Sequence, residues 1–182
     1  MLTYTEDELL RFVEESNRIE GLYTIEADIA AHEEFFSQPN VAPSDLERLV
    51  FKLQPGAVLR HAAGLDVVVG DHRPPPGGST VVRALHLPLT DVSFRRMPPW
   101  QAHRAYESLH PFTDGNGRSG RALWAWQMLH HDHHPGIRLG FLHAFYYQTL
   151  AQDDGDWFRK AVLRTELQGW WRARRLRREL SR

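Results

Sequence analysis

Residues His110–Arg121 read HPFTDGNGRSGR, and this stretch gathers a base, a carboxylate, an amide and two arginines within one short segment. Gly115 and Gly117 allow the backbone to turn with φ > 0, and Asn116 between them also tolerates such a turn. Successive N–H groups in a turn of this kind point into one concavity and bind anions. The stretch therefore predicts a loop that binds phosphate.

Helices are predicted on both sides of this loop. Pro98 and Pro99 favour the start of a helix that runs to Leu109, and Pro111 excludes the residue before it from the helical region. A second helix is expected to begin at about Gly117 or Arg118 and to reach His130. Its N-terminus would add the positive end of a helix dipole to the predicted anion site.

The rest of the chain also favours helices, with one exception. Residues 57–60 and 65–69 are β-prone runs around 61–64, and 70–78 is rich in proline and glycine, so a small hairpin is expected at 57–78. The spacing of apolar residues and the helix-stop residues predict further helices at 6–20, 25–37, 45–53 (capped by Ser44), 80–91, 141–150 and 157–168. The expected fold is a single mainly helical domain over residues 1–182.

Composition excludes several classes of protein. The chain has 182 residues and a formal net charge of −1, so no overall field attracts nucleic acid or an anionic membrane. It contains no cysteine, which excludes disulfides and thiolate metal sites. The acidic N-terminal segment does not resemble a signal peptide, and no apolar run approaches the ~20 residues of a membrane helix. A cytoplasmic protein without nucleic-acid or membrane partners is expected.

The loop and its helical setting resemble the Fic (Fido) family, whose signature HxFx(D/E)GNGRxxR is matched at every fixed position of His110–Arg121. The resemblance implies a helical bundle with a β-hairpin flap at about 57–78 and a catalytic loop at 110–121. It also implies transfer of AMP from Mg-ATP to a Tyr, Ser or Thr hydroxyl of a protein target that docks on the flap.

The residues of the loop suit this reaction. Attack by a hydroxyl on the α-phosphorus needs a general base, and the ordinary pKa of His110 lies near neutrality. Asp114 is the carboxylate expected to hold Mg²⁺ between the phosphates, since Mg²⁺ takes only one or two protein carboxylates besides water and substrate oxygens. Tyr147 falls where the family has its adenine pocket, and both stacking on the base and ordinary core packing remain open for it.

The nucleotide phosphates are expected to contact the second half of the loop. The backbone of Gly115 and Gly117 and the guanidinium groups of Arg118 and Arg121 supply preorganised donors for charge that develops toward pyrophosphate. The family pattern further implies that Asn116 helps to hold the α-phosphate, while the two arginines face the β- and γ-phosphates. Because the arginines are three residues apart, they are expected to share a helix face.

A second short pattern lies far upstream, where Ser16–Gly21 reads SNRIEG. It resembles the (S/T)xxxE(G/N) inhibitory motif of Fic proteins, here on a helix at about 6–21. We expect Glu20 to pair with Arg121 and to hold ATP in an unproductive pose, with Ser16 as the other fixed residue of the motif.

Three functional hypotheses are compatible with these residues. The first is an autoinhibited protein adenylyltransferase. The second is another reaction of the same site, either removal of AMP with Glu20 activating water or transfer of a different phosphate-containing group; the intact GNGR pattern disfavours phosphorylation. The third is a noncatalytic nucleotide-binding interaction module. A homodimer is also left open, since inhibitory contacts in this family can depend on assembly.

Overall fold

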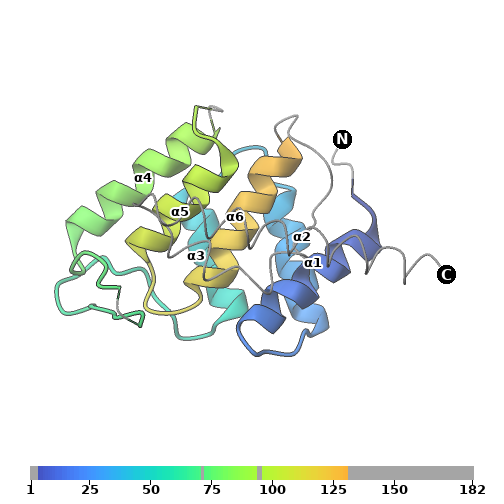
Figure 1. The fold of residues 1–182 in the computed structure, drawn as a ribbon, viewed down its shortest axis with the longest axis horizontal. Coiled ribbons are helices and arrows are strands. Elements are labelled where there is room, and N and C mark those ends of the chain that lie inside the picture. Colours follow the sequence, from blue (N-terminus) through green and yellow to red (C-terminus); the bar gives the residue numbers. More distant parts are fainter. Residues whose placement is uncertain (1–3, 71, 94–95, 131–182) are drawn as a thin grey trace, which may run out of the picture. The chain divides into compact units, whose positions relative to one another are not determined.

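The computed structural model describes residues 4–70, 72–93 and 96–130. Within these residues the chain forms six α-helices and no strand beyond isolated β-bridges (Figure 1). The helices are α1 (Glu6–Ile19), α2 (Glu26–Phe36), α3 (Pro43–Leu53), α4 (Ser79–Ser93), α5 (Pro99–Leu109) and α6 (Asn116–His130). The predicted mainly helical fold class is therefore confirmed.

Helix α6 is the central helix of this part of the chain, because it packs against α1, α2, α3 and α5 (Figure 1). Its buried residues include Leu123 and Trp126 and also two arginines, Arg118 and Arg121. A buried charge is costly unless neighbouring groups bind it. The packing of α6 therefore depends on partners that other helices supply to these two side chains.

Helix α1 carries the upstream motif on an amphipathic helix, as predicted. Its N-terminus is closed by a capping box in which the Thr5 side chain accepts from the Glu8 N–H and the Glu8 carboxylate accepts from the Thr5 N–H. Phe12 and Val13 are buried on its inner face. The helix ends at Ile19, so the glutamate of the motif follows it as the C-cap residue.

One predicted cap is wrong. Ser44 was expected to cap the third helix, but α3 begins at Pro43 and its N-cap residue is Ala42. The Asp45 carboxylate accepts a hydrogen bond of 2.8 Å from the Ala42 N–H. Proline suits the first helical position because the N–H that it lacks would have no partner there, so the helix starts before Ser44.

The hairpin expected at 57–78 is not formed in the described residues. Leu59 instead makes an isolated antiparallel bridge with Phe112 of the HPFTDGNGRSGR loop. The Arg60 N–H donates a hydrogen bond of 2.8 Å to the Pro111 carbonyl. Backbone groups of the loop that follows α5 thus bond to the first β-prone run. This run therefore does not pair with 65–69 as predicted.

The second β-prone run, 65–69, forms an isolated bridge instead of a strand pair. Val69 forms an isolated bridge with His72, with hydrogen bonds of 3.0 and 2.9 Å between their backbones. The described residues between α3 and α4 thus form a loop with several tight turns, at 54–57, 62–65 and 69–72, and the first β-prone run lies against the HPFTDGNGRSGR loop.

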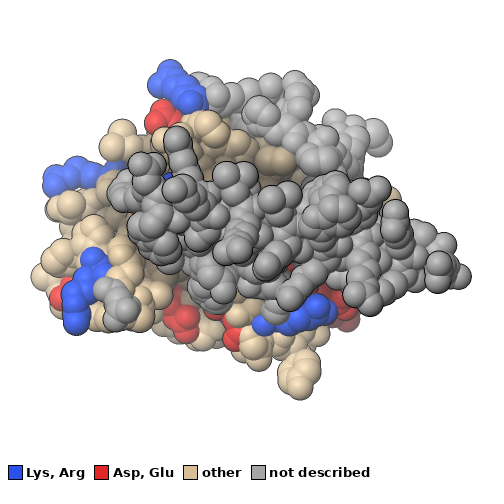
Figure 2. Space-filling view, viewed as in Figure 1, with Lys and Arg blue, Asp and Glu red and all other residues tan. Residues whose placement is uncertain are grey.

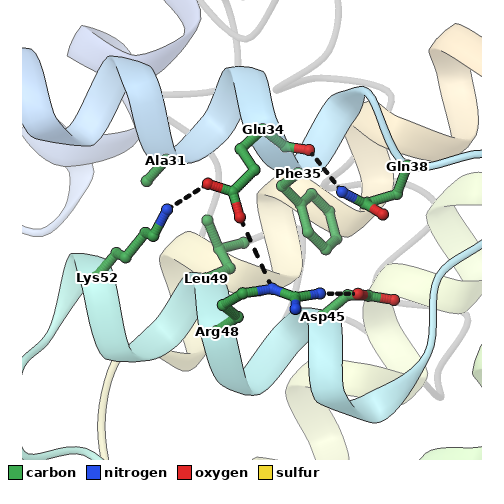
Figure 3. Close-up of a pocket in the computed structure, with 8 residues that line it drawn as sticks. All are labelled: Ala31, Glu34, Phe35, Gln38, Asp45, Arg48, Leu49 and Lys52. Atoms are coloured by element: carbon green, nitrogen blue, oxygen red, sulfur yellow. Dashed lines mark hydrogen bonds and ion pairs between the residues drawn. The ribbon is translucent and has the colours of Figure 1, made fainter.

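A small hollow separates the outer faces of α2 and α3 (Figure 3). Glu34 of α2 pairs there with Lys52 and Arg48 of α3, and Arg48 also pairs with Asp45. The cavity measures about 10 Å³, which is room for about one water molecule. The solvated ion pairs join the two helices. The cavity itself has no room for a larger ligand.

On the face shown in Figure 2, both basic and acidic side chains are visible among the described residues. Among the described helices, none combines the length and the apolar character that a membrane span requires. The helices predicted at 141–150 and 157–168 lie outside the described residues.

Candidate functional site

His110 lies at the C-terminal end of α5, with φ 47° and ψ 63° in the left-handed region. Its Nδ1 is 2.9 Å from the Glu107 carbonyl oxygen. Because a carbonyl only accepts hydrogen bonds, Nδ1 carries the proton in this contact and Nε2 keeps its lone pair. Burial lowers the pKa of His110 below its ordinary value. The imidazole is therefore a neutral base at neutral pH, with Nε2 as the atom that can accept a proton.

Asn116 closes the loop that follows. Its side-chain oxygen accepts a hydrogen bond of 2.8 Å from the Phe112 N–H, and its side-chain nitrogen donates one of 2.8 Å to the Phe112 carbonyl. The side chain is buried, so both of its polar atoms are engaged by the main chain. The structure thus places the amide, which was predicted to hold the α-phosphate, as a clamp of the loop.

Gly115 and Gly117 occupy the loop for different physical reasons. Gly115 has φ 75°, as predicted, and precedes the first residue of α6. The expectation of φ > 0 at Gly117 is wrong, because this residue already lies in the first helical turn. A Cβ at Gly117 would overlap with Oε1 of Glu20 and lie 3.1 Å from Nη1 of Arg121. A side chain at this position would therefore have to displace the Glu20 carboxylate, so close approach and not the backbone angle favours glycine there.

Arg121 is almost fully covered by the upstream motif. Its Nε donates to Oγ of Ser16 at 2.9 Å, and its Nη2 donates to the Ser16 carbonyl at 2.9 Å and to Oε1 of Glu20 at 2.6 Å. The arginine side chain is 1% exposed and the Glu20 side chain is 30% exposed. The structure therefore brings together the three residues of the predicted inhibitory contact, beside the first two turns of α6.

Arg118 does not share the partners of the second arginine. Its Nη2 donates a hydrogen bond of 2.6 Å to Oε1 of Gln54, which is the C-cap residue of α3. Burial lowers the pKa of Arg118, while the carboxylates of Asp28 and Glu20 raise it. The guanidinium remains charged, since arginine is not deprotonated in proteins. The two arginines, which were predicted to share a helix face, thus contact different neighbours: Arg118 binds the end of α3 and Arg121 binds α1.

The end of α1 is held in place by a buried polar cluster. Nδ2 of Asn17 donates to Oδ2 of Asp28 at 2.9 Å and to Oγ1 of Thr24 at 3.1 Å. The same carboxylate oxygen accepts from the Ile25 N–H at 3.2 Å. Gly21, in the turn between α1 and α2, has φ 71° and follows the C-cap residue of α1. These contacts fix the turn between α1 and α2 and with it the position of the Glu20 backbone.

Asp114 is the exposed acidic residue of the loop. Its Oδ1 accepts a hydrogen bond of 2.6 Å from the Gly115 N–H, which orients the carboxylate beside the start of α6. A cation such as Mg²⁺ would find there one solvated carboxylate next to a turn of backbone donors, which fits a metal that takes its other ligands from phosphate oxygens and water.

Several residues of this site escape prediction from the sequence. Gln54 follows an ordinary amphipathic helix, and Asn17 stands between the fixed positions of its motif. Arg60, whose side chain is fully buried, carries a charge inside a β-prone run and binds the carbonyls of Leu109 and His110. The one signal for it was that charge itself, because a cation in a short apolar run requires a partner. Tyr147 lies outside the described residues.

Comparison with known proteins bears on the centre of this site. The model of the Fic/DOC family matches residues 100–128, which span most of α5, the loop and most of α6. No curated protein matches the chain.

Proposed function

We propose that the chain, whose residues 100–128 match the Fic/DOC family model, is a member of that family and transfers AMP from Mg-ATP to a Tyr, Ser or Thr hydroxyl of a protein target. Membership by itself points to a transferase of phosphate-containing groups. The observation that supports the finer proposal is the position of His110, a neutral imidazole with Nε2 available, directly before a helix N-terminus that carries two buried arginines.

The proposed step is an in-line displacement. The target hydroxyl oxygen forms a bond to the α-phosphorus, and the bond from that phosphorus to the oxygen bridging to the β-phosphorus breaks. Nε2 of His110 receives the hydroxyl proton, and the AMP moiety remains on the target while pyrophosphate leaves. A positioned base of this kind contributes about 10²- to 10⁴-fold to a rate.

The leaving phosphates require positive charge, and the start of α6 provides it. Gln54 holds Arg118 and Ser16 holds Arg121 before nucleotide arrives, so both guanidinium groups are preorganised for the phosphates once Glu20 has left Arg121. Asp114 would hold the Mg²⁺ that neutralises the same phosphates. Asn116 keeps the loop closed, and with it the backbone donors of the first turn stay in place.

Glu20 is proposed to act as an inhibitor of this reaction. Its carboxylate lies on Arg121 and against Gly117, at the helix N-terminus where an anionic phosphate would bind. Two anions cannot share these donors, so a nucleotide that binds beside Glu20 is held away from the reactive pose. The same carboxylate would be the group that activates water if the site removes AMP.

The target is proposed to dock at Leu59, which lies in the segment where the flap was expected. In the bridge between Leu59 and Phe112, the hydrogen bonds are made by the neighbours of these two residues and not by the two residues themselves. The Leu59 N–H therefore points away from the loop. Within the described residues this N–H has no hydrogen-bond partner. An extended target segment can add there by a backbone hydrogen bond, close to His110.

Leu59→Pro is expected to lower modification of a protein target by about tenfold or more, since proline removes this donor and blocks an added strand. Nucleotide binding should not change. Ala62→Pro is the matched control, because Ala62 is exposed and its N–H also has no partner within the described residues. Equal modification by the two variants, measured by α-label transfer, would exclude docking at Leu59.

The proposed function is tested by incubating the purified protein and a cell lysate with Mg-ATP that carries a label on the α- or the γ-phosphate. Wild type and Glu20→Gly are compared, and intact mass identifies the added group. Retention of α-label alone, with the mass of AMP, is expected. Retention of γ-label indicates phosphorylation, release of AMP from a modified protein indicates the reverse reaction, and binding without either indicates a noncatalytic module.

A further inference from the structure

The C-terminal end of α5 lacks the backbone bonds that usually close a helix. The residue after the C-cap ordinarily donates its N–H to a carbonyl of the last turn. Here the C-cap residue is His110, and the next residue, Pro111, has no N–H. His110 is also the single non-glycine residue with positive φ among those described, a conformation in which the Cβ crowds the backbone. The base of the site therefore lies in a strained backbone position that requires support from elsewhere.

Arg60 supplies that support from a distant part of the chain. Its Nε donates a hydrogen bond of 2.6 Å to the His110 carbonyl, and its Nη2 donates one of 2.8 Å to the Leu109 carbonyl. These are the last carbonyl groups of α5, where the negative end of the helix dipole favours a cation. The guanidinium thus binds two helix-end carbonyls that accept no backbone N–H within the described residues.

The same side chain also organises the segment between α3 and α4. Its Nη1 donates to the Pro75 carbonyl at 2.8 Å and to the Leu65 carbonyl at 3.4 Å. All its side-chain hydrogen bonds to described residues thus go to carbonyl oxygens, and the side chain is completely buried. A buried cation bonded in this way to three stretches of backbone holds them in one arrangement, since moving any of them would leave its charge unsatisfied.

We propose that Arg60 is a positioning residue for the general base. It fixes the left-handed backbone of His110 and so keeps Nδ1 on the Glu107 carbonyl and Nε2 available. Release of the His110 carbonyl would let the imidazole adopt the other tautomer and other rotamers. This inference rests on the proposed function for the role of the base, but the arrangement of the imidazole can be tested without any transfer reaction.

The first test is the tautomer of His110. Long-range ¹H–¹⁵N spectra of histidine-labelled protein, with the signal assigned through His110→Asn, are expected to show a single Nδ1–H form in the wild type. In Arg60→Lys a mixture of both tautomers is expected, because one ammonium group cannot bind the two carbonyls in the fixed geometry of a guanidinium. Arg83→Lys, which changes an exposed arginine of α4, is the control and should leave the signal unchanged.

The second test is kinetic and uses the Glu20→Gly background. Arg60→Lys is expected to lower kcat for α-label transfer about 10- to 100-fold, while the KM for ATP changes less than about threefold, since Arg60 contacts the base and not the phosphates. An equal loss in kcat and in nucleotide affinity would indicate a general structural role and overturn the proposal.

The tautomer test also separates this inference from the proposed function. If Glu20→Gly transfers no label, the proposed function fails, yet the tautomers of wild type and Arg60→Lys still decide the role of Arg60. If Arg60→Lys does not fold, the wild-type spectrum remains decisive, because mixed tautomers in the unaltered protein would contradict a fixed imidazole. An unchanged Nδ1–H tautomer together with an unchanged kcat in a folded Arg60→Lys would also overturn the proposal.

Discussion

Glu20→Gly is expected to raise transfer of α-label from Mg-ATP to protein by roughly 10- to 100-fold over the wild type. The variant frees Arg121 and the first turn of α6 for phosphate. A hydrogen bond between charged groups contributes about 1.5–3 kcal/mol, and each 1.36 kcal/mol corresponds to about tenfold in rate. Initial rates at saturating Mg-ATP, with the protein itself or a lysate as acceptor, measure the change.

Glu20→Gly should also change the thermal stability of the protein, which can be measured without any transfer reaction. Loss of Glu20 leaves the buried Arg121 with Ser16 as its remaining partner in α1, so the thermal midpoint should fall in the absence of nucleotide. Mg-ATP should raise the midpoint more in Glu20→Gly than in the wild type, since it binds the folded state of the variant without competition.

Two matched substitutions separate the loss of charge from the loss of the side chain. Glu20→Gln keeps the shape of the side chain and removes its charge, so it should activate transfer as well. Glu14→Gln makes the same change at an exposed position of α1 and should not. If Glu20→Gly and Glu14→Gln transfer label at the wild-type rate, Glu20 does not inhibit the reaction.

His110→Ala is expected to lower transfer about 10²- to 10⁴-fold in the Glu20→Gly background, because it removes the proposed acceptor of the hydroxyl proton. Binding of nucleotide should persist, since the phosphate donors lie in α6. Asparagine tolerates the left-handed conformation better than alanine, so His110→Asn tests the chemistry with less strain on the backbone. His86→Ala, at an exposed histidine of α4, is the control.

The pH dependence of transfer follows from the pKa of His110. Burial lowers this pKa, the charges of His72 and Arg60 lower it further, and the Glu107 carbonyl and the Glu20 carboxylate raise it. A lowered pKa keeps most of the imidazole in its base form at neutral pH, so the rate should fall to half of its maximum only below about pH 6.5. A rate that already halves above pH 6.5 would show that the base is a different group or that the pKa is not lowered.

Much of the described fold could be predicted from local sequence. The spacing of apolar residues in α1, the prolines before α5 and Pro111 after it determine where those helices lie, because each acts within a few residues of itself. The hairpin at 57–78 could not be excluded in this way. Its first run is β-prone by composition, but its partner is Phe112, and nothing local shows that a loop more than fifty residues away offers a better pairing.

The sequence by itself determined the chemical groups of the site: a base, a carboxylate, two arginines and a glycine-containing turn in HPFTDGNGRSGR, with a glutamate upstream. Only the tertiary structure decided what each group contacts. It places Glu20 on Arg121 across 101 residues, joins Arg118 to Gln54 across 64, and uses Arg60 to close the helix that ends at His110. Residue spacing states which side chains share one helix face, whereas these partners come from other helices and loops and are selected by packing and by the need to satisfy buried charge.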